Sequence, residues 1–171
     1  TELTISEMTP VHTLLGLPIT WLIGPIAAYN LVVILSFILT GFSVYLLAHR
    51  LGANRGAAWV AGLMFALTLS RVNHAAEGHL GFLGSQWPAL ALYGWEGVLR
   101  YRRAWDMQLA ALGLALTFWT SWHYGTTLPL VLAIYTLVRL GWRGTFELLR
   151  QPQPFVVGAL LSRIFEEKQG S

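Results

Sequence analysis

The stretch Pro25-Ile-Ala-Ala-Tyr-Asn-Leu-Val-Val-Ile-Leu-Ser-Phe-Ile-Leu-Thr-Gly-Phe-Ser-Val-Tyr-Leu-Leu-Ala48 decides the fold class, because it is long, apolar and free of charged side chains. At about 1.5 Å per residue, a helix over residues 26–49 reaches roughly 35 Å, enough to cross a bilayer. Pro25 suits the first helical position, where a missing N–H costs nothing. Gly41 and Ser43 offer a small face for close helix contact. The stretch therefore predicts a membrane-spanning helix.

The composition of the whole chain points the same way. Of 171 residues, 55% are hydrophobic and 11% are charged, whereas soluble domains have about 25% charged residues. The net charge of +3 comes from short basic clusters between apolar runs, which excludes the one-sided basic face of a nucleic-acid binder. The absence of cysteine excludes disulfide and thiolate chemistry. We expect one all-α transmembrane domain.

Outward from the first span, further apolar runs predict more helices. A tight turn follows, with Gly52 just past a helix end and Asn54 at an N-cap. The predicted spans cover residues 56–70, 82–99, about 106–120 with Asp106 as a cap, and 126–140. Residues 10–24 are too short and broken to cross, so 1–25 is an outer interfacial segment. The prediction is a multi-pass transmembrane helical bundle of about five spans over residues 26–150.

Both ends suggest a fragment of a longer protein. The chain begins with Thr1, shows no signal peptide and ends abruptly at Ser171. The apolar run 155–161 is too short for a span. We expect residues 1–171 to form a single domain, with 151–171 as the truncated start of a further segment.

The arginines set the orientation. One side of the predicted bundle receives eight of them and the other side receives only Arg71. The eight are Arg50, Arg55, Arg100, Arg102, Arg103, Arg139, Arg143 and Arg150. By the positive-inside rule, residues 1–25, 71–81 and 120–125 lie on the non-cytoplasmic face of the cell membrane.

The polar segment 71–81 carries the strongest local signal for chemistry. A carboxylate and an imidazole two residues apart, Glu77 and His79, can converge on one cation if the backbone between them is extended, which Gly78 permits. Mg²⁺ and Mn²⁺ favour carboxylate oxygen, and Mn²⁺ also accepts imidazole. His74 shares a face with Glu77 if the segment is helical. The alternative is that these side chains are only solvated at the headgroups.

Other polar side chains on the outer side are candidates for substrate binding. Arg71 suits a bidentate contact with phosphate, or it only snorkels to lipid headgroups. Gln86, beside Pro88, faces the same side. His123 and Tyr124 can stack on and bond to a sugar, whereas neighbouring Trp119 suits an aromatic belt.

Glu96 is an isolated carboxyl deep in the predicted span 82–99. An unpaired charge is expensive there. It is neutral, or it bonds to a neighbouring helix, or it relays protons in a transporter.

Three motifs resemble the C-type (GT-C) membrane glycosyltransferases, in an uncharacterised bacterial branch, over roughly residues 10–140. They are Gly24-Pro-Ile-Ala-Ala-Tyr-Asn30, Ala61-Gly-Leu-Met-Phe-Ala-Leu-Thr-Leu-Ser70, and Glu77-Gly-His-Leu80 with Gln86-Trp-Pro-Ala-Leu90. The resemblance implies transfer of a sugar from a polyprenyl-phosphate carrier on the non-cytoplasmic face. In oligosaccharyltransferases of this class, an acidic motif that Glu77 and His79 match contributes to the metal site.

One part of the family pattern is missing. The main catalytic aspartate of such enzymes lies in the first outer loop, and residues 1–25 contain no aspartate. The resemblance therefore implies that this carboxylate, the base, and one span lie upstream of residue 1, and that the fragment is inactive alone.

Two functions follow as hypotheses. The first is a glycosyltransferase core in which Mg²⁺ or Mn²⁺ on Glu77 and His79, assisted by Arg71, neutralises the departing lipid phosphate. Its partners would be membrane lipid and a polyprenyl-phosphate sugar donor, with no nucleic acid. The alternative is a non-enzymatic transporter or a polymer or lipid export component that uses Glu96 and the polar segment as a path.

Overall fold

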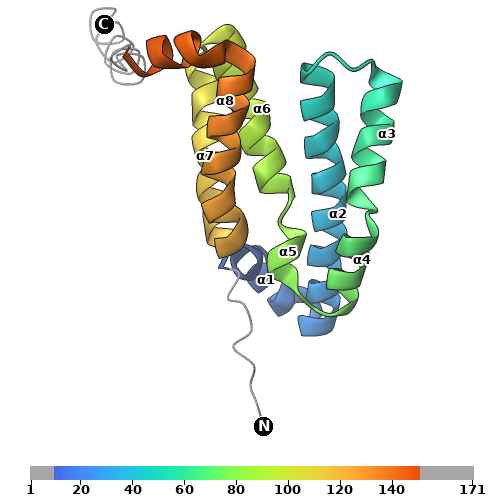
Figure 1. Cartoon of the computed structure of the whole chain (residues 1–171). Coiled ribbons are helices and arrows are strands. Elements are labelled where there is room, and N and C mark those ends of the chain that lie inside the picture. The colour runs from blue at the N-terminus through green and yellow to red at the C-terminus, as the bar shows by residue number, and fades with distance from the viewer. Residues whose placement is uncertain (1–9, 151–171) are drawn as a thin grey trace, which may run out of the picture.

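The computed structural model describes residues 10–150, and this part is helical, with no strand. In chain order the helices are α1 (Pro10–Ile23), α2 (Pro25–Arg50), α3 (Arg55–Ala66), α4 (Leu69–Ala76), α5 (Leu80–Leu83), α6 (Gln86–Tyr101), α7 (Ala104–Thr120) and α8 (Trp122–Arg150). In Figure 1, α2 and α3 form one group of long helices and α6, α7 and α8 another. The shorter α1, α4 and α5 lie together at one end of both groups. The all-α class predicted from the sequence is confirmed.

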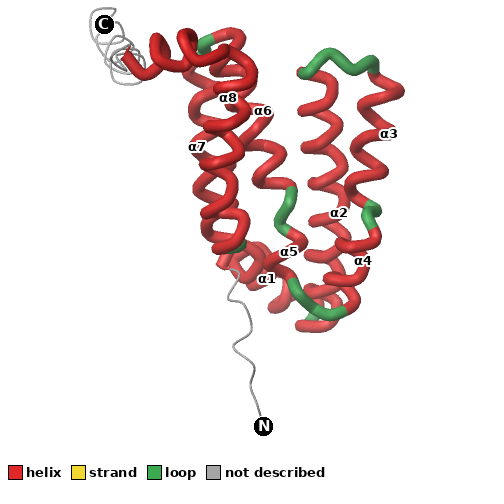
Figure 2. Tube along the Cα trace, in the orientation of Figure 1, coloured by secondary structure: helices red, strands yellow, loops and turns green. Residues whose placement is uncertain are grey.

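The first hairpin folds as its sequence indicates. α2 begins at Pro25 and ends at Arg50, close to the predicted bounds 26–49. Gly52 has a φ of 106°, a left-handed conformation that glycine adopts without strain. The Asn54 side chain accepts a hydrogen bond from the backbone N–H of Ala57, 2.8 Å away, and so caps α3. Figure 2 shows this connection as a short loop between two helices.

Small residues bring neighbouring helices close together. A Cβ atom added to Gly94 of α6 would collide with the backbone of α7, 2.7 Å from Asp106 O. A Cβ on Gly113 of α7 would lie 2.6 Å from the backbone N of Ala91 in α6. The predicted small face of α2 is also used, because a Cβ on Gly41 would lie 3.4 Å from the carbonyl oxygen of Gly62 in α3. Backbone contact of this kind is typical of helix packing in membranes.

The second predicted span is shorter than expected. α3 stops at Ala66 instead of residue 70, and a new helix starts at Leu69. Thr68 leaves the helical conformation, with ψ at 136°, and its hydroxyl donates to the carbonyl oxygen of Phe65 at 2.6 Å. Such local bonds let threonine compete with helix continuation. The polar segment 71–81 is therefore not a simple loop, because α4 covers its first half.

Within residues 10–150, two helices are long and apolar enough to cross a membrane, α2 and residues Trp122–Thr145 of α8. Their large apolar side chains face outward, for example Ile38 at 60% exposed on α2 and Val138 at 79% on α8. An outward apolar surface of this kind suits lipid contact. α6 and α7 have 16 and 17 residues, and the arrangement of five spans stays a prediction.

Two ion pairs lie near the arginine-rich end. Asp106 is 2% exposed and accepts a hydrogen bond of 2.7 Å from Arg50. It lies in the first turn of α7, whose N-cap is Arg103, so the prediction of Asp106 as the cap is wrong. Glu96 is fully buried and bonds to both Arg139 and Tyr135 of α8. This confirms the interpretation that Glu96 bonds to a neighbouring helix.

Candidate metal centre and its surroundings

Glu77 and His79 converge as the sequence suggested, but through a turn instead of an extended backbone. Glu77 ends α4 in a helical conformation, and Gly78 turns the chain with a φ of 80°. Glycine adopts this left-handed conformation readily. The turn places His79 Nδ1 3.3 Å from Glu77 Oε2. A carboxylate and an imidazole therefore face each other at the end of the bundle.

His74 joins this pair because α4 is helical where a loop was expected. Its position three residues before Glu77 puts both on one face, with His74 Nδ1 3.6 Å from Glu77 Oε2. Potential ligand atoms of His74, Glu77 and His79 all lie within 4.8 Å of one another. We call these three residues the HEH cluster. His74 Nδ1 is buried without a hydrogen-bond partner, as expected for an atom that is free to bind a metal.

The donor set of the HEH cluster fits a divalent metal. Two imidazole nitrogens and one carboxylate oxygen suit transition metals, including Mn²⁺, better than Mg²⁺, which prefers oxygen and water. Glu77 and His79 are more than half exposed, at 58% and 52%. Water would therefore reach the metal and complete its coordination, as at catalytic sites with an open position.

The ring of Phe82 contacts the rings of four neighbouring residues, His74, His79, His123 and Tyr124. Its ring stacks on His74 with centroids 4.6 Å apart and on His123 at 6.1 Å. Tyr124 and His79 meet it edge-on at 6.1 and 6.3 Å. Four predicted site residues from separate parts of the chain thus meet around one ring. The sequence did not single out Phe82, because a phenylalanine within an apolar run carries no distinctive signal.

Arg71 is buried, so its interpretation as a snorkelling residue is wrong. The residue is 5% exposed, and its guanidinium donates to Ser85 Oγ at 2.6 Å and to the carbonyl oxygen of Leu83 at 3.1 Å. It also lies over the ring of Phe37, 5.1 Å from the centroid. The pKa of Arg71 is lowered, mainly because the side chain is buried, and nearby Tyr124 opposes this effect only in part. Arg71 therefore clamps the turn between α5 and α6.

Gln86 lies in the same buried network. It is 2% exposed, and its side-chain oxygen accepts hydrogen bonds from Thr40 at 3.1 Å and Ser36 at 3.3 Å. These bonds join α6 to α2, and they use the acceptor that a substrate hydroxyl would need. A direct contact of Gln86 with substrate stays a prediction.

His12 is buried, which the sequence did not predict. The sequence placed it only within the outer segment 1–25. It lies in α1, is 3% exposed, and neither ring nitrogen has a hydrogen-bond partner. Burial and the positive charge of Arg71 lower its pKa. No local pattern could identify it, because its burial depends on how α1 folds across the end of the bundle.

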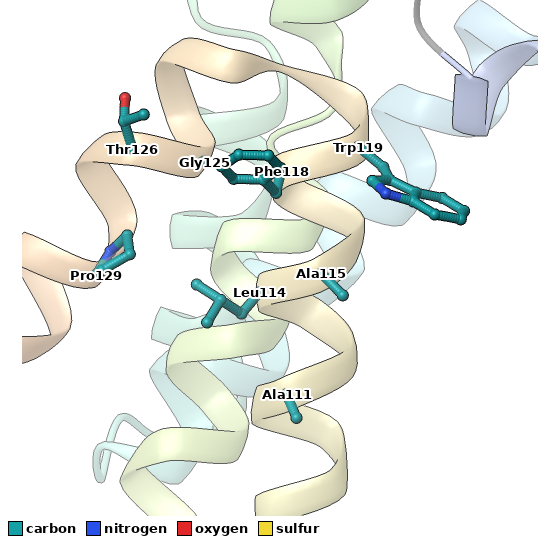
Figure 3. Close-up of a pocket in the computed structure, with 8 residues that line it drawn as sticks. All are labelled: Ala111, Leu114, Ala115, Phe118, Trp119, Gly125, Thr126 and Pro129. Atoms are coloured by element: carbon teal, nitrogen blue, oxygen red, sulfur yellow. The ribbon is translucent and has the colours of Figure 1, made fainter.

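An apolar groove of about 500 Å³ lies between α7 and α8. Figure 3 shows Phe118 beside Gly125, with Thr126 and Pro129 on the facing helix. Trp119 extends outward from this groove and is 61% exposed, as an aromatic-belt residue would be. A second cavity of about 450 Å³ at the arginine-rich end is lined by Glu96, Arg100 and Arg139 among others. Neither is lined by a residue predicted to bind the metal or the sugar donor.

No family model matches the chain, and neither the curated proteins nor the solved structures contain one similar to it. Its function has to be argued from the site.

Proposed function

We propose that the chain is the core of a metal-dependent membrane glycosyltransferase that takes a sugar from a polyprenyl-phosphate carrier on the non-cytoplasmic face. The observation that carries this proposal is the HEH cluster, with its donor atoms within 4.8 Å. It lies where α4 and α5 meet, at the end of the bundle opposite the connection between α2 and α3. This position supports the orientation expected from the positive-inside rule.

Each part of the site has a chemical task in this proposal. Glu77 and His79, joined by His74, would hold the divalent metal, which supplies positive charge for the phosphate of the departing carrier. His123 and Tyr124 flank Phe82 beside the cluster. Their rings and polar atoms can stack on and bond to a sugar. Mn²⁺ is the favoured cofactor because two of the three ligands are imidazoles.

The base for the transfer would have to come from another part of the protein. Transfer to an acceptor hydroxyl or amide needs a group that takes a proton. Among the described side chains, the carboxylates outside the HEH cluster are Glu96 and Asp106, and both are paired with arginines. The expected upstream carboxylate stays a prediction.

The alternative, transport along Glu96, has less support. A proton-relay carboxyl should be able to lose and gain a proton, but Glu96 is held by Arg139 and Tyr135 on α8. Glu96 also lies ten residues along α6 from Gln86, or about 15 Å of helix. This separation along α6 gives less support to a path that joins the polar segment 71–81 to Glu96.

Glycosyl transfer by the full-length protein in proteoliposomes tests the proposal. With a polyprenyl-phosphate sugar donor and Mn²⁺, we expect transfer that is lost with EDTA and restored by Mn²⁺. Glu77→Ala and His79→Ala should lower the rate about 10- to 100-fold or more, as loss of metal-site groups does elsewhere.

The matched control is His49→Ala. His49 is exposed and lies at the opposite end of α2, so it should leave the rate unchanged. Transfer that survives EDTA and both cluster substitutions would rule out the proposal.

A further inference from the structure

Arg71 carries a buried charge that no side chain neutralises among the described residues. Its hydrogen bonds go to neutral oxygens, Ser85 Oγ and the Leu83 carbonyl, with a longer contact of 3.5 Å to the Ser36 carbonyl. Its Nε has no partner. Removing an unpaired charge from water is costly, so buried charges are normally paired.

The other buried charges of the described chain follow that rule. Asp106 pairs with Arg50 at 2.7 Å, and Glu96 pairs with Arg139. Glu77, the nearest carboxylate to Arg71 in sequence, is 58% exposed and turns toward the histidines. Within residues 10–150, Arg71 is the exception, and a buried charge without a partner there needs a physical explanation.

Two other buried residues, His12 and Thr120, also have side-chain groups that lack a partner and can donate a hydrogen. His12 has two unpartnered ring nitrogens, one of which bears a hydrogen in the neutral ring, and Thr120 has an unpartnered hydroxyl. Both residues are 3% exposed. No carboxylate or amide oxygen is left without a partner among the buried described side chains. Arg71 Nε can only donate, and His12 and Thr120 each have a hydrogen to donate, so one bound acceptor could serve all three.

These donors converge on one short turn. Arg71 bonds to Leu83 and Ser85, which flank Gly84. A Cβ atom on Gly84 would meet the Thr120 side chain and would lie 3.5 Å from Cε1 of His12. Side chains from α1, α4 and α7 thus meet around the turn that contains Gly84.

We propose that one small inorganic anion binds at this point as the counter-ion of Arg71, accepting hydrogen bonds from Arg71 Nε, His12 and Thr120. An ordered water could bond to the same atoms, but it would leave the guanidinium charge uncompensated. The donors are at least 95% buried, which suits chloride or free phosphate better than a lipid headgroup. This anion site does not depend on the proposed transferase activity.

Anion-dependent thermal unfolding of the purified chain in detergent tests the inference. Sodium chloride or inorganic phosphate replaces sodium gluconate at constant ionic strength, and tryptophan fluorescence reports unfolding. A ligand that binds only the folded state raises the midpoint with increasing concentration. We expect such a rise, with apparent affinity about tenfold weaker in His12→Phe and about 10- to 100-fold weaker in Arg71→Met.

Arg55→Gln is the matched control, because Arg55 is exposed and lies at the opposite end of the bundle. It should keep the wild-type anion response. A midpoint that is the same in chloride, phosphate and gluconate, or an equal response in wild type and His12→Phe, would overturn the inference.

Two further experiments use only the wild-type protein, so they do not depend on whether a variant folds. Crystals grown in sodium bromide should show an anomalous peak within hydrogen-bond distance of Arg71 Nε, and density for water alone would contradict the site. In the second experiment, polyprenyl phosphate is added to protein in gluconate without chloride or inorganic phosphate. This separates binding of a lipid phosphate from binding of a free inorganic anion. Stabilisation by that lipid without any effect of chloride or phosphate would show a substrate phosphate there and refute an inorganic counter-ion.

Discussion

Arg50 and Asp106 lie 56 residues apart in the chain, and their side chains meet at 2.7 Å to join α2 to α7. The guanidinium of Arg50 also bonds to the Tyr93 carbonyl at 2.7 Å and lies over the Tyr93 ring. One arginine thus links three helices at the end opposite the HEH cluster. This ion pair helps to fix the relative position of the two helix groups.

Replacement of Asp106 by alanine should strongly destabilise the fold. Asp106 is 2% exposed and Arg50 is 14% exposed, so the substitution leaves a nearly buried guanidinium without its carboxylate. Breaking a buried pair in this way costs about 3–5 kcal/mol. The free energy of unfolding in detergent measures the loss, with exposed Arg55→Ala as control. A loss under about 1 kcal/mol, typical of a surface pair, would contradict this account.

Because α6 and α7 lie in close contact, Gly94→Ala should lower the stability of the fold, although alanine favours the helical conformation more than glycine does. The added methyl would meet the α7 backbone, and overpacking costs about 1–3 kcal/mol. Gly56→Ala is the paired comparison, because its nearest neighbour is a side-chain oxygen 3.6 Å away. That change should be neutral or stabilise by up to about 1 kcal/mol. Equal stability of both variants would show that α6 and α7 do not touch as described.

His12 should make stability depend on pH in gluconate buffer without small anions. Burial and Arg71 lower its pKa in the folded state from the usual 6.5. The unfolded chain then binds the proton more readily, so stability rises with pH. The contribution is complete above about pH 7 and is lost as pH falls through 6.5 toward the folded pKa.

The unfolding midpoint between pH 7.5 and 5.5 measures this effect. His12→Phe should show a smaller fall than wild type over that range. Identical slopes in the two proteins would mean that His12 is not held neutral. Small anions are left out because an anion bound beside His12 would favour its protonated form and oppose the effect.

The parts of the fold that follow local rules were predictable from the sequence. An apolar run as long as residues 26–49 has few alternatives to a helix, and α2 matches it closely. Asn54 capped the next helix as expected, because capping depends only on the first turn. The sequence suggested that Glu77 and His79 could converge, but through an extended backbone, whereas they meet through a turn at Gly78.

The parts that depend on tertiary contact were not predictable. Glu96 and Arg139 are 43 residues apart, and no local pattern pairs them. The burial of Arg71 requires the turn at Leu83 and Ser85 to fold over it. α4, which begins at Leu69 and covers the first half of the polar segment, was missed because the segment has few apolar residues, and polar residues alone do not exclude a helix.

The most direct test of the central claim is Mn²⁺ binding to the purified protein, followed by electron paramagnetic resonance of the free ion. The account predicts one saturable site that is weakened about 10-fold or more in His74→Ala, Glu77→Ala and His79→Ala, and unchanged in His49→Ala. A wild-type protein that binds no Mn²⁺, or one whose binding survives all three cluster substitutions, would contradict a metal centre at Glu77 and His79.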